Sequence, residues 1–441
     1  MPSDSLLRRP HFLHISRHHT FDISTVAAAD YDVDVHSGFM PPQEPVARLL
    51  GEYEAWEDLL DHAIGKLKLA GDAFATVQDR EYIACWRQKV RELPIVDADP
   101  LYKDERALRR AHVVLSYLTH LYVHSVTHSP SCPISIPQSL SIPLVSVSRE
   151  LGIPPILTYA DTIDPSLPVG PNNIRSVTNI TGTGDEDHFY MTSARIELRG
   201  VEALTLMRAT LDETFLSDAL TITRVSTYLT RLAGVIDDIS ALLMSVRQDC
   251  DPDVFYNQFR PWINGGTAHP SGWNFDGFAK LSGPSAGQSS LVHALDIFLG
   301  VEHPPHGSSE STENPTHPSP SFRPSTSSGM FLQKQLLYMP RHHRAFLSYL
   351  SKHVDQPKLK EAYNSAVDAL KRFRDGHIRI VTLYIIAQAK GNVDPSSLFS
   401  SAAVQSGEEA KGPRGSGGTL LVPFLKSIRD NTSRTFIHRG A

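Results

Sequence analysis

The stretch KEAYNSAVDALKRFRDGHIRIVTLYIIAQA, residues 360–389, repeats its apolar side chains at intervals of three and four residues. That spacing places them along one face of an α-helix. On this face lie Phe373, His377, Val381 and Tyr384. A histidine therefore stands in the middle of an apolar helix face, with aromatic and branched neighbours one turn away. The stretch predicts a long amphipathic helix and raises the question of what its imidazole contacts.

Two interpretations of His377 are open at this point. A neutral imidazole tolerates burial when one ring nitrogen finds a hydrogen-bond acceptor, and the pattern alone favours such a core histidine. The alternative is a ligand to a metal or to haem iron, because imidazole is the commonest protein ligand for such centres. The position of His377 in its helix does not decide between them.

Helical spacing dominates the rest of the chain as well. Strand patterns are few, and one weak candidate is SIPLVSVS, residues 141–148. The other stretches with apolar residues at helical spacing are 105–126, 223–248, 289–303 and 344–354. The sequence therefore predicts an all-α protein.

Changes in composition divide the chain. Between Gly170 and Asp187 it becomes polar and glycine-rich, so we expect a smaller, mostly helical N-terminal domain and a larger helical domain. The division is residues 1–180 and 181–441, with a proline- and serine-rich segment at 303–329 and a glycine-rich one at 400–418. The first has too few apolar residues to bury, so we expect a disordered loop there, and the second predicts a flexible loop.

Bulk properties exclude several classes of protein. The net charge is −6, which gives a nucleic-acid partner no electrostatic support. No apolar run is long enough for a membrane span, and the first residues lack the apolar core of a secretory signal. Cys85, Cys132 and Cys250 form neither a disulfide framework nor a C-x-x-C pair, which is typical of the reducing cytoplasm. Without a C-x-x-C-H motif, covalent haem attachment is also excluded.

Two motifs have ordinary structural interpretations. GPSAGQSS (283–290) lacks the GxSxG arrangement of a hydrolase, and it predicts a tight turn into a helix that Ser289 caps. FYNQFRP (255–261) places an aromatic residue five positions before an arginine, a pairing that is usually a surface arginine beside core aromatics.

Taken in order, however, these blocks and several others resemble the indoleamine 2,3-dioxygenase family, whose members are haem enzymes that open the indole ring of tryptophan. The resemblance begins with GFMPP at Gly38 and covers most of the chain. Its further blocks are LGIPPILTYAD (151–161), YMPRHHRAFL (338–347), RDGHIRIVTLYI (374–385), GSGGT (415–419) and FLKSIRD (424–430).

The resemblance implies a role for three residues at the centre of a site. His377 aligns with the family's proximal ligand to the iron of a non-covalently bound haem b. Phe255 matches the aromatic residue that packs on the substrate indole. Arg260 matches the arginine that holds the substrate carboxylate. On this basis we expect Ser193, Phe255 and Arg260 to serve catalysis and His377 to bind the metal.

The resemblance also implies a pocket around them. Tyr122, Phe189 and Ser193 match the wall of the distal pocket above the iron. Ala286 falls where small residues let the backbone approach the haem face. Thr419 matches a mobile loop that closes over the ammonium group of the substrate.

The chain departs from the family pattern at several positions. Pro284 stands where glycine is common, and His124 stands where an aromatic residue is frequent. Arg195 and Arg199 lie on the expected distal helix, and the segment 303–329 is an insertion. None of them is the expected iron ligand, so they bear on substrate affinity.

The resemblance implies a cytoplasmic dioxygenase that converts L-tryptophan and dioxygen to N-formylkynurenine, with an unidentified reducing partner. Such an activity supplies the kynurenine pathway for tryptophan catabolism or NAD biosynthesis. The alternative is a haem or tryptophan sensor on the same scaffold, with little or no catalysis.

Overall fold

The computed structural model describes residues 31–165, 174–213, 219–275, 278, 280–303, 328–353, 359–391, 413–415 and 420–437. Over these residues helices predominate and the strands are only two or three residues long. The predicted all-α class is confirmed. No described helix is long and apolar enough to cross a membrane.

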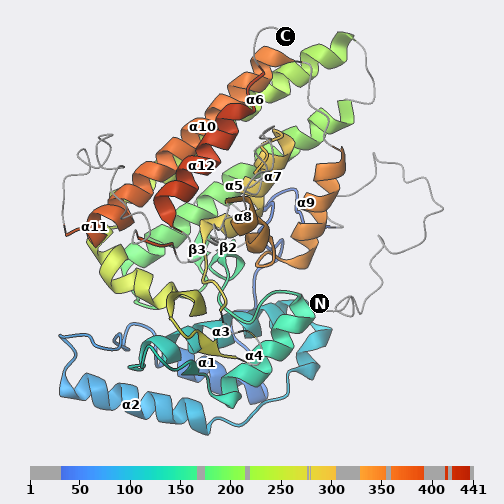
Figure 1. Ribbon diagram of the computed structural model, residues 1–441. Helices are drawn as coiled ribbons and strands as arrows, with labels where there is room; N and C mark the ends of the chain where they lie inside the picture. Colours follow the sequence, from blue (N-terminus) through green and yellow to red (C-terminus); the bar gives the residue numbers. More distant parts are fainter. Residues whose placement is uncertain are drawn as a thin grey trace, which may run out of the picture.

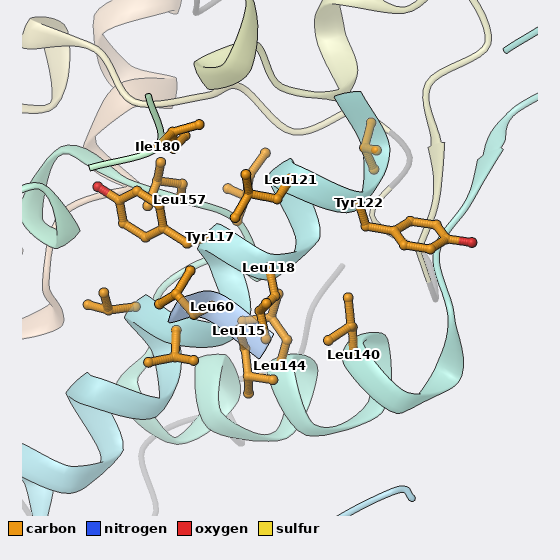
Figure 2. Packing of buried hydrophobic residues seen from close by; sticks show 14 of the residues in the cluster. Leu60, Leu115, Tyr117, Leu118, Leu121, Tyr122, Leu140, Leu144, Leu157 and Ile180 are labelled. Atoms are coloured by element: carbon orange, nitrogen blue, oxygen red, sulfur yellow. The ribbon is translucent and has the colours of Figure 1, made fainter. Parts of the chain in front are cut away.

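Helices from the N-terminal part of the chain gather at one end of the molecule, shown in blue and teal in Figure 1. They are α1 (Glu54–Asp61), α2 (Val77–Glu92), α3 (Glu105–His124) and α4 (Gln138–Leu151). Asp104 caps α3 through its side chain, which accepts a hydrogen bond from the backbone N–H of Arg106 at 3.0 Å. Almost the whole of α3 is buried, and Figure 2 shows Leu115, Leu118 and Leu121 packed inside this end.

The strand predicted at 141–148 is wrong, because these residues form part of α4. Its buried positions include Leu140, Leu144 and Val147, which recur at three- and four-residue spacing and pack against α3. Packing of this apolar face overrides both the β-branched composition and Pro143 inside the helix.

Long helices form the other end, shown from green to red in Figure 1. Helix α6 packs against both α5 and α10, and α12 packs against α10. The bounds are α5 (Gly184–Glu213), α6 (Ala219–Asp249), α7 (Ser290–Phe298), α8 (Ser328–Leu336), α9 (Arg341–His353), α10 (Lys360–Val381), α11 (Ala387–Ala389) and α12 (Leu421–Arg434). The predicted helices at 105–126, 223–248, 289–303, 344–354 and 360–389 correspond to α3, α6, α7, α9 and α10.

A glycine lets α7 approach α5. A Cβ atom on Gly200 would lie 2.2 Å from the side chain of Leu291, which is far inside normal contact distance. Both residues are buried, so a larger residue at position 200 would have to displace the buried Leu291 side chain.

Short elements join the helices. Strand β1 (Ile134–Ser135) pairs in parallel with β4 (Trp273–Asn274), and β2 (Ile163–Pro165) pairs antiparallel with β3 (Ile174–Ser176). The single-turn elements are η5 (Gly51–Tyr53), η6 (Asp99–Lys103), η7 (Tyr159–Asp161), η9 (Arg260–Ile263), η10 (Gly266–Ala268) and η11 (Ala286–Gln288), and the π-helical ones are η8 (Val254–Phe259) and η12 (Thr382–Ile386).

Two large hydrophobic clusters underlie the two ends. The first includes residues from α1 to α4 but also Phe255, Trp262 and Trp273. The second is built around α5, α6, α7 and α10. Because the first cluster takes in residues 255–275, the chain returns to the N-terminal end after α6, and the expected domain boundary at residue 180 stays a prediction.

Candidate active site

A cavity of about 180 Å³ lies where η8 and η9 meet the ends of α5 and α10, and its lining is mainly apolar. Segments far apart in the sequence contribute to it. The lining residues are Tyr159, Thr162, Phe189, Tyr190, Ser193, Val246, Phe255, Arg260, Ile263, Pro284, Ser285, Ala286, Gly287, Phe331, His377, Ile380, Val381, Tyr384, Ile385, Gly415, Leu421, Phe424 and Leu425. Six of the expected site residues are therefore brought together: Phe189, Ser193, Phe255, Arg260, Ala286 and His377.

His377 reaches this cavity from the middle of the apolar face of α10. Burial, together with the charge of Arg374, lowers its pKa to about 4, so the imidazole is neutral at physiological pH. Within the described residues neither ring nitrogen has a hydrogen-bond partner. A core histidine would be expected to have one. An imidazole lone pair that faces an apolar cavity fits an iron ligand better.

A buried ion pair holds α10 in place near His377. Arg374, one turn earlier, pairs with Asp296 of α7 and donates to the Ile428 carbonyl of α12 at 3.0 Å. His303 Nε2 lies 3.0 Å from the second carboxylate oxygen of Asp296. Burial raises the pKa of Asp296, but the charge of Arg374 and the His303 hydrogen bond outweigh it and hold this pKa below its usual value. The pair therefore links three helices behind the imidazole.

Aromatic rings form one wall of the cavity. The centroids of Phe189 and Phe255 are 4.9 Å apart, and Phe255 meets Tyr384 edge-on at 5.5 Å. Phe255 lies in the π-helical turn η8 and Tyr384 in the π-helical turn η12. Such turns are frequent at functional sites. This wall offers a flat apolar surface of the kind that an indole requires.

Arg260 carries a cationic group to the cavity. Its guanidinium lies over the ring of Tyr256 at 5.4 Å and donates to the backbone carbonyl of Arg414. Burial lowers its pKa, although an arginine stays charged. Within the described residues it has no acidic partner. An anion entering the cavity would therefore meet an arginine whose charge is not neutralised.

Ser193 lies on α5 beside the aromatic wall. Its hydroxyl is 3.4 Å from the Phe189 carbonyl one turn earlier, the back-bond that serine often makes in helices. It also adjoins the side chain of Tyr159, which lines the cavity from η7.

Ala286 begins a tight turn that leads into α7. The Ser285 side chain accepts a hydrogen bond from the N–H of Gly287 at 3.2 Å, and Ser289 accepts one from Val292 at 3.3 Å. The predicted turn with Ser289 as helix cap is thus confirmed. Pro284 also lines the cavity, so its substitution for glycine changes the cavity surface itself.

One expected site residue differs from the prediction, and a second lies outside the described residues and stays a prediction. Tyr122 does not line the cavity, and its expected place in the distal wall is corrected: its hydroxyl accepts from Arg91 at 3.4 Å, and Figure 2 shows its ring directed away from Leu118 and Leu121. The leucines of α3 face the hydrophobic core, so Tyr122 lies on another side of this helix and is directed towards α2. Thr419 lies outside the described residues, as do 304–327 and 400–412 of the two expected loops.

Three further departures from the family pattern, at His124, Arg195 and Arg199, lie off the cavity lining. His124 is half-buried and its Nε2 lies 2.8 Å from the Asn264 carbonyl, which joins α3 to the segment after η9. Arg199 forms ion pairs with Glu202 and Asp238. Arg195 is half-buried on α5.

The donor set of the cavity fits haem, with a single neutral imidazole and an apolar lining. At about 180 Å³ the cavity is below the roughly 300–1,000 Å³ of small-molecule sites. A porphyrin is larger than this volume, so its binding would require lining side chains to move. The edge-to-face pair Phe331 and Phe424, with centroids 4.7 Å apart, is part of this lining.

The family model described as indoleamine 2,3-dioxygenase matches residues 27–435 of the chain. The chain belongs to the indoleamine 2,3-dioxygenase family. Enzymes of this family are haem-dependent dioxygenases, which agrees with the imidazole and apolar lining of the cavity.

Three relatives illustrate the range of the indoleamine 2,3-dioxygenase family. The chain is 30% identical to indoleamine 2,3-dioxygenase of Saccharomyces cerevisiae, with 92% of each chain covered. It is 29% identical to 6-hydroxytryptophan 2,3-dioxygenase of Fusarium equiseti, covering 91% of this chain and 96% of the relative. It is also 28% identical to a myoglobin of Haliotis diversicolor, covering 79% of this chain and 86% of the relative.

The sequence analysis missed two residues next to the cavity. Tyr159 lines it within the block LGIPPILTYAD, and Glu197 accepts the hydrogen bond of the Tyr159 hydroxyl at 3.0 Å. A signal for Glu197 was present, because it follows Ser193 by four residues and so lies on the same face of one helix.

Proposed function

We propose that this chain is a haem b-dependent dioxygenase that converts L-tryptophan and dioxygen to N-formylkynurenine. The observation that carries the proposal is His377, a neutral imidazole with no described partner at the wall of an apolar cavity. Membership of the indoleamine 2,3-dioxygenase family supports the same activity.

In this proposal His377 would be the side chain of the cavity that holds the haem iron. Arg374 positions the imidazole by anchoring α10 to α7 and α12. The bound haem supplies the activation of dioxygen, which no side chain of the cavity can provide.

The substrate is held at two points. Phe255 and Phe189 offer the indole an apolar surface, and Arg260 pairs with the carboxylate. Guanidinium matches a carboxylate with two parallel hydrogen bonds. Fixing both ends brings the indole double bond to the oxygen and lowers the entropic part of the barrier.

In this proposal the remaining lining residues shape the cavity and do not transfer protons. Ser193 bonds weakly to its own helix, and we assign it no essential role as a base. Ala286 and Pro284 have short side chains, so the turn before α7 takes up little of the cavity that it borders. We keep Thr419 as a proposed contact to the substrate ammonium group on the family pattern alone.

The biological setting is part of the proposal. We place the enzyme in the cytoplasm, in tryptophan catabolism or NAD biosynthesis through the kynurenine pathway, with a reducing partner still to be identified. We also propose residues 1–180 as a small N-terminal domain and 181–441 as the haem domain.

A second candidate is a haem protein that binds dioxygen or tryptophan with little or no catalysis. The 28% identity to a protein named myoglobin favours it, because that relative covers most of the chain. Arg260 argues for the enzyme, since an oxygen carrier has no need of an unneutralised arginine at its cavity.

The experiment is to load the purified protein with haem b, reduce it, and add L-tryptophan in air. Appearance of N-formylkynurenine absorbance supports the dioxygenase. A stable, reversible oxygen spectrum with no product supports the second candidate. His377→Ala is the control, and it should lose the Soret band; retention of the full band and of turnover would exclude the proximal role.

A further inference from the structure

A second, smaller cavity of about 40 Å³ lies behind the active-site cavity. Tyr159 lines both, so this residue borders the two cavities. A space of this size holds one water molecule or a few, given polar partners. Glu197 supplies such a partner, since it lines the second cavity.

Glu197 is a buried carboxyl group with an incomplete set of hydrogen bonds. It is 3% exposed, and its Oε1 accepts from the Tyr159 hydroxyl at 3.0 Å and from Ser289 Oγ at 2.7 Å. Its Oε2 is buried and has no hydrogen-bond partner among the described residues. A buried carboxylate oxygen without a partner is costly, and water in the second cavity would satisfy it.

Among the residues that the structure describes, no cation pairs with Glu197. Arg109, which faces the second cavity from α3, is paired with Glu105 at 2.8 Å. His343, which faces it from α9, is neutral because burial lowers its pKa to about 3. Burial raises the pKa of Glu197 to about 7, against the opposing hydrogen bonds from Ser289 and Tyr159. The group therefore changes charge close to neutral pH.

We propose that Glu197 is a positioning residue that sets the direction of the Tyr159 hydroxyl at the wall of the active-site cavity. Ionised Glu197 accepts the Tyr159 O–H, so the phenol oxygen presents only a lone pair to the cavity. When Glu197 is protonated through the water of the second cavity and carries the proton on Oε1, the oxygen next to Tyr159, this O–H becomes the donor to the Tyr159 oxygen. The Tyr159 O–H then turns towards the cavity and Ser193.

Burial holds the pKa of Tyr159 well above its usual value, so Tyr159 keeps its proton in both states and only the direction of the hydrogen bond changes. The cavity wall thus offers an acceptor above about pH 7 and a donor below it. The effect on catalysis rests on the proposed dioxygenase function, whereas the protonation of Glu197 does not.

Infrared difference spectroscopy of the haem-free protein between acidic and alkaline pH tests the protonation directly. A carboxylic-acid band should titrate near pH 7 and be lost in Glu197→Gln. Glu186→Gln is the matched control, since Glu186 is also a buried glutamate of α5 with a raised pKa but hydrogen-bonds Thr181 and Ile180 instead. That variant should keep the band. Persistence of the band in Glu197→Gln would overturn the proposal.

Tyr159→Phe tests the coupling and serves if Glu197→Gln does not fold. Loss of the Tyr159 hydrogen bond should shift the frequency of the Glu197 band and raise its pKa, because that bond stabilises the ionised form. An unchanged band would overturn the coupling.

With haem-loaded protein, the pH profile of kcat/KM should lose its inflection near pH 7 in Glu197→Gln at unchanged haem content. An inflection that survives there would contradict the positioning role. Absence of haem binding or turnover in the wild type would instead remove the proposed function and leave the infrared result standing.

Discussion

Replacement of Arg260 by alanine should reduce kcat/KM for L-tryptophan by at least about a hundredfold. Arg260 is half-buried at the cavity, donates to one backbone carbonyl, and has no acidic partner in the described part of the chain. Its charge is therefore available to a substrate carboxylate that has lost its water.

Removal of one partner from a desolvated charge pair costs about 3–5 kcal/mol. Each 1.36 kcal/mol corresponds to about tenfold in rate, so this range corresponds to about two to four decades. The lower limit applies here because Arg260 is not fully buried. Arg260→Lys should recover only part of the loss, because an ammonium group cannot make the planar two-point contact.

The assay compares L-tryptophan with tryptamine, which lacks the carboxylate. Arg260→Ala should affect tryptamine far less, and its Soret band should match that of the wild type. Arg344→Ala is the control, because Arg344 is also half-buried with a burial-lowered pKa and donates to backbone carbonyls, but it does not line the cavity. Equal losses on both substrates would refute the carboxylate-binding role.

Three further predictions concern packing, charge and the cavity wall. Gly200→Ala should destabilise the protein by about 1–3 kcal/mol in urea unfolding, because its Cβ would overlap a buried leucine. The control Gly234→Ala on α6, with open space around it, should stabilise the protein by about 0.5–1 kcal/mol. Equal effects of the two substitutions would contradict the close approach of α5 and α7. Asp296→Asn should lower the free energy of unfolding by about 3–5 kcal/mol by leaving Arg374 buried and unpaired. Because the pKa of Asp296 is depressed in the folded state, its contribution is present above about pH 4 and is lost as the pH falls through the folded pKa, so wild type and variant should converge in acid. Ser193→Ala should retain kcat within about tenfold, since general acid–base groups usually contribute about 10²–10⁴, and a thousandfold loss with intact haem would show a proton-transfer role.

Helical periodicity was sufficient to predict α3, α6, α9 and α10, because each has an apolar face that continues over several turns. It failed at 141–148, where serine and valine alternate in a way that fits either a strand or the buried face of α4. Only the packing against α3 distinguishes the two, and packing between distant segments is not visible in a local pattern.

Those residues of the candidate site that lie in recognisable sequence motifs could be predicted. Phe255 and Arg260 come from the block FYNQFRP and His377 from the block RDGHIRIVTLYI, and the structure gathers all three at one cavity. The side of α3 on which Tyr122 lies could not be predicted from the sequence around it. A small rotation of the helix decides whether this side chain faces the cavity or contacts Arg91. Glu197 was missed because its importance depends on a buried oxygen and a neighbouring cavity, which exist only in three dimensions.

The most direct test of the central proposal is the fate of dioxygen. Haem-loaded, reduced protein is supplied with L-tryptophan under ¹⁸O₂, and the product is analysed by mass spectrometry. A dioxygenase built around His377 predicts N-formylkynurenine that carries both labelled oxygen atoms. Reversible oxygen binding without product, or product that carries a single labelled oxygen under conditions that prevent exchange with water, would contradict it.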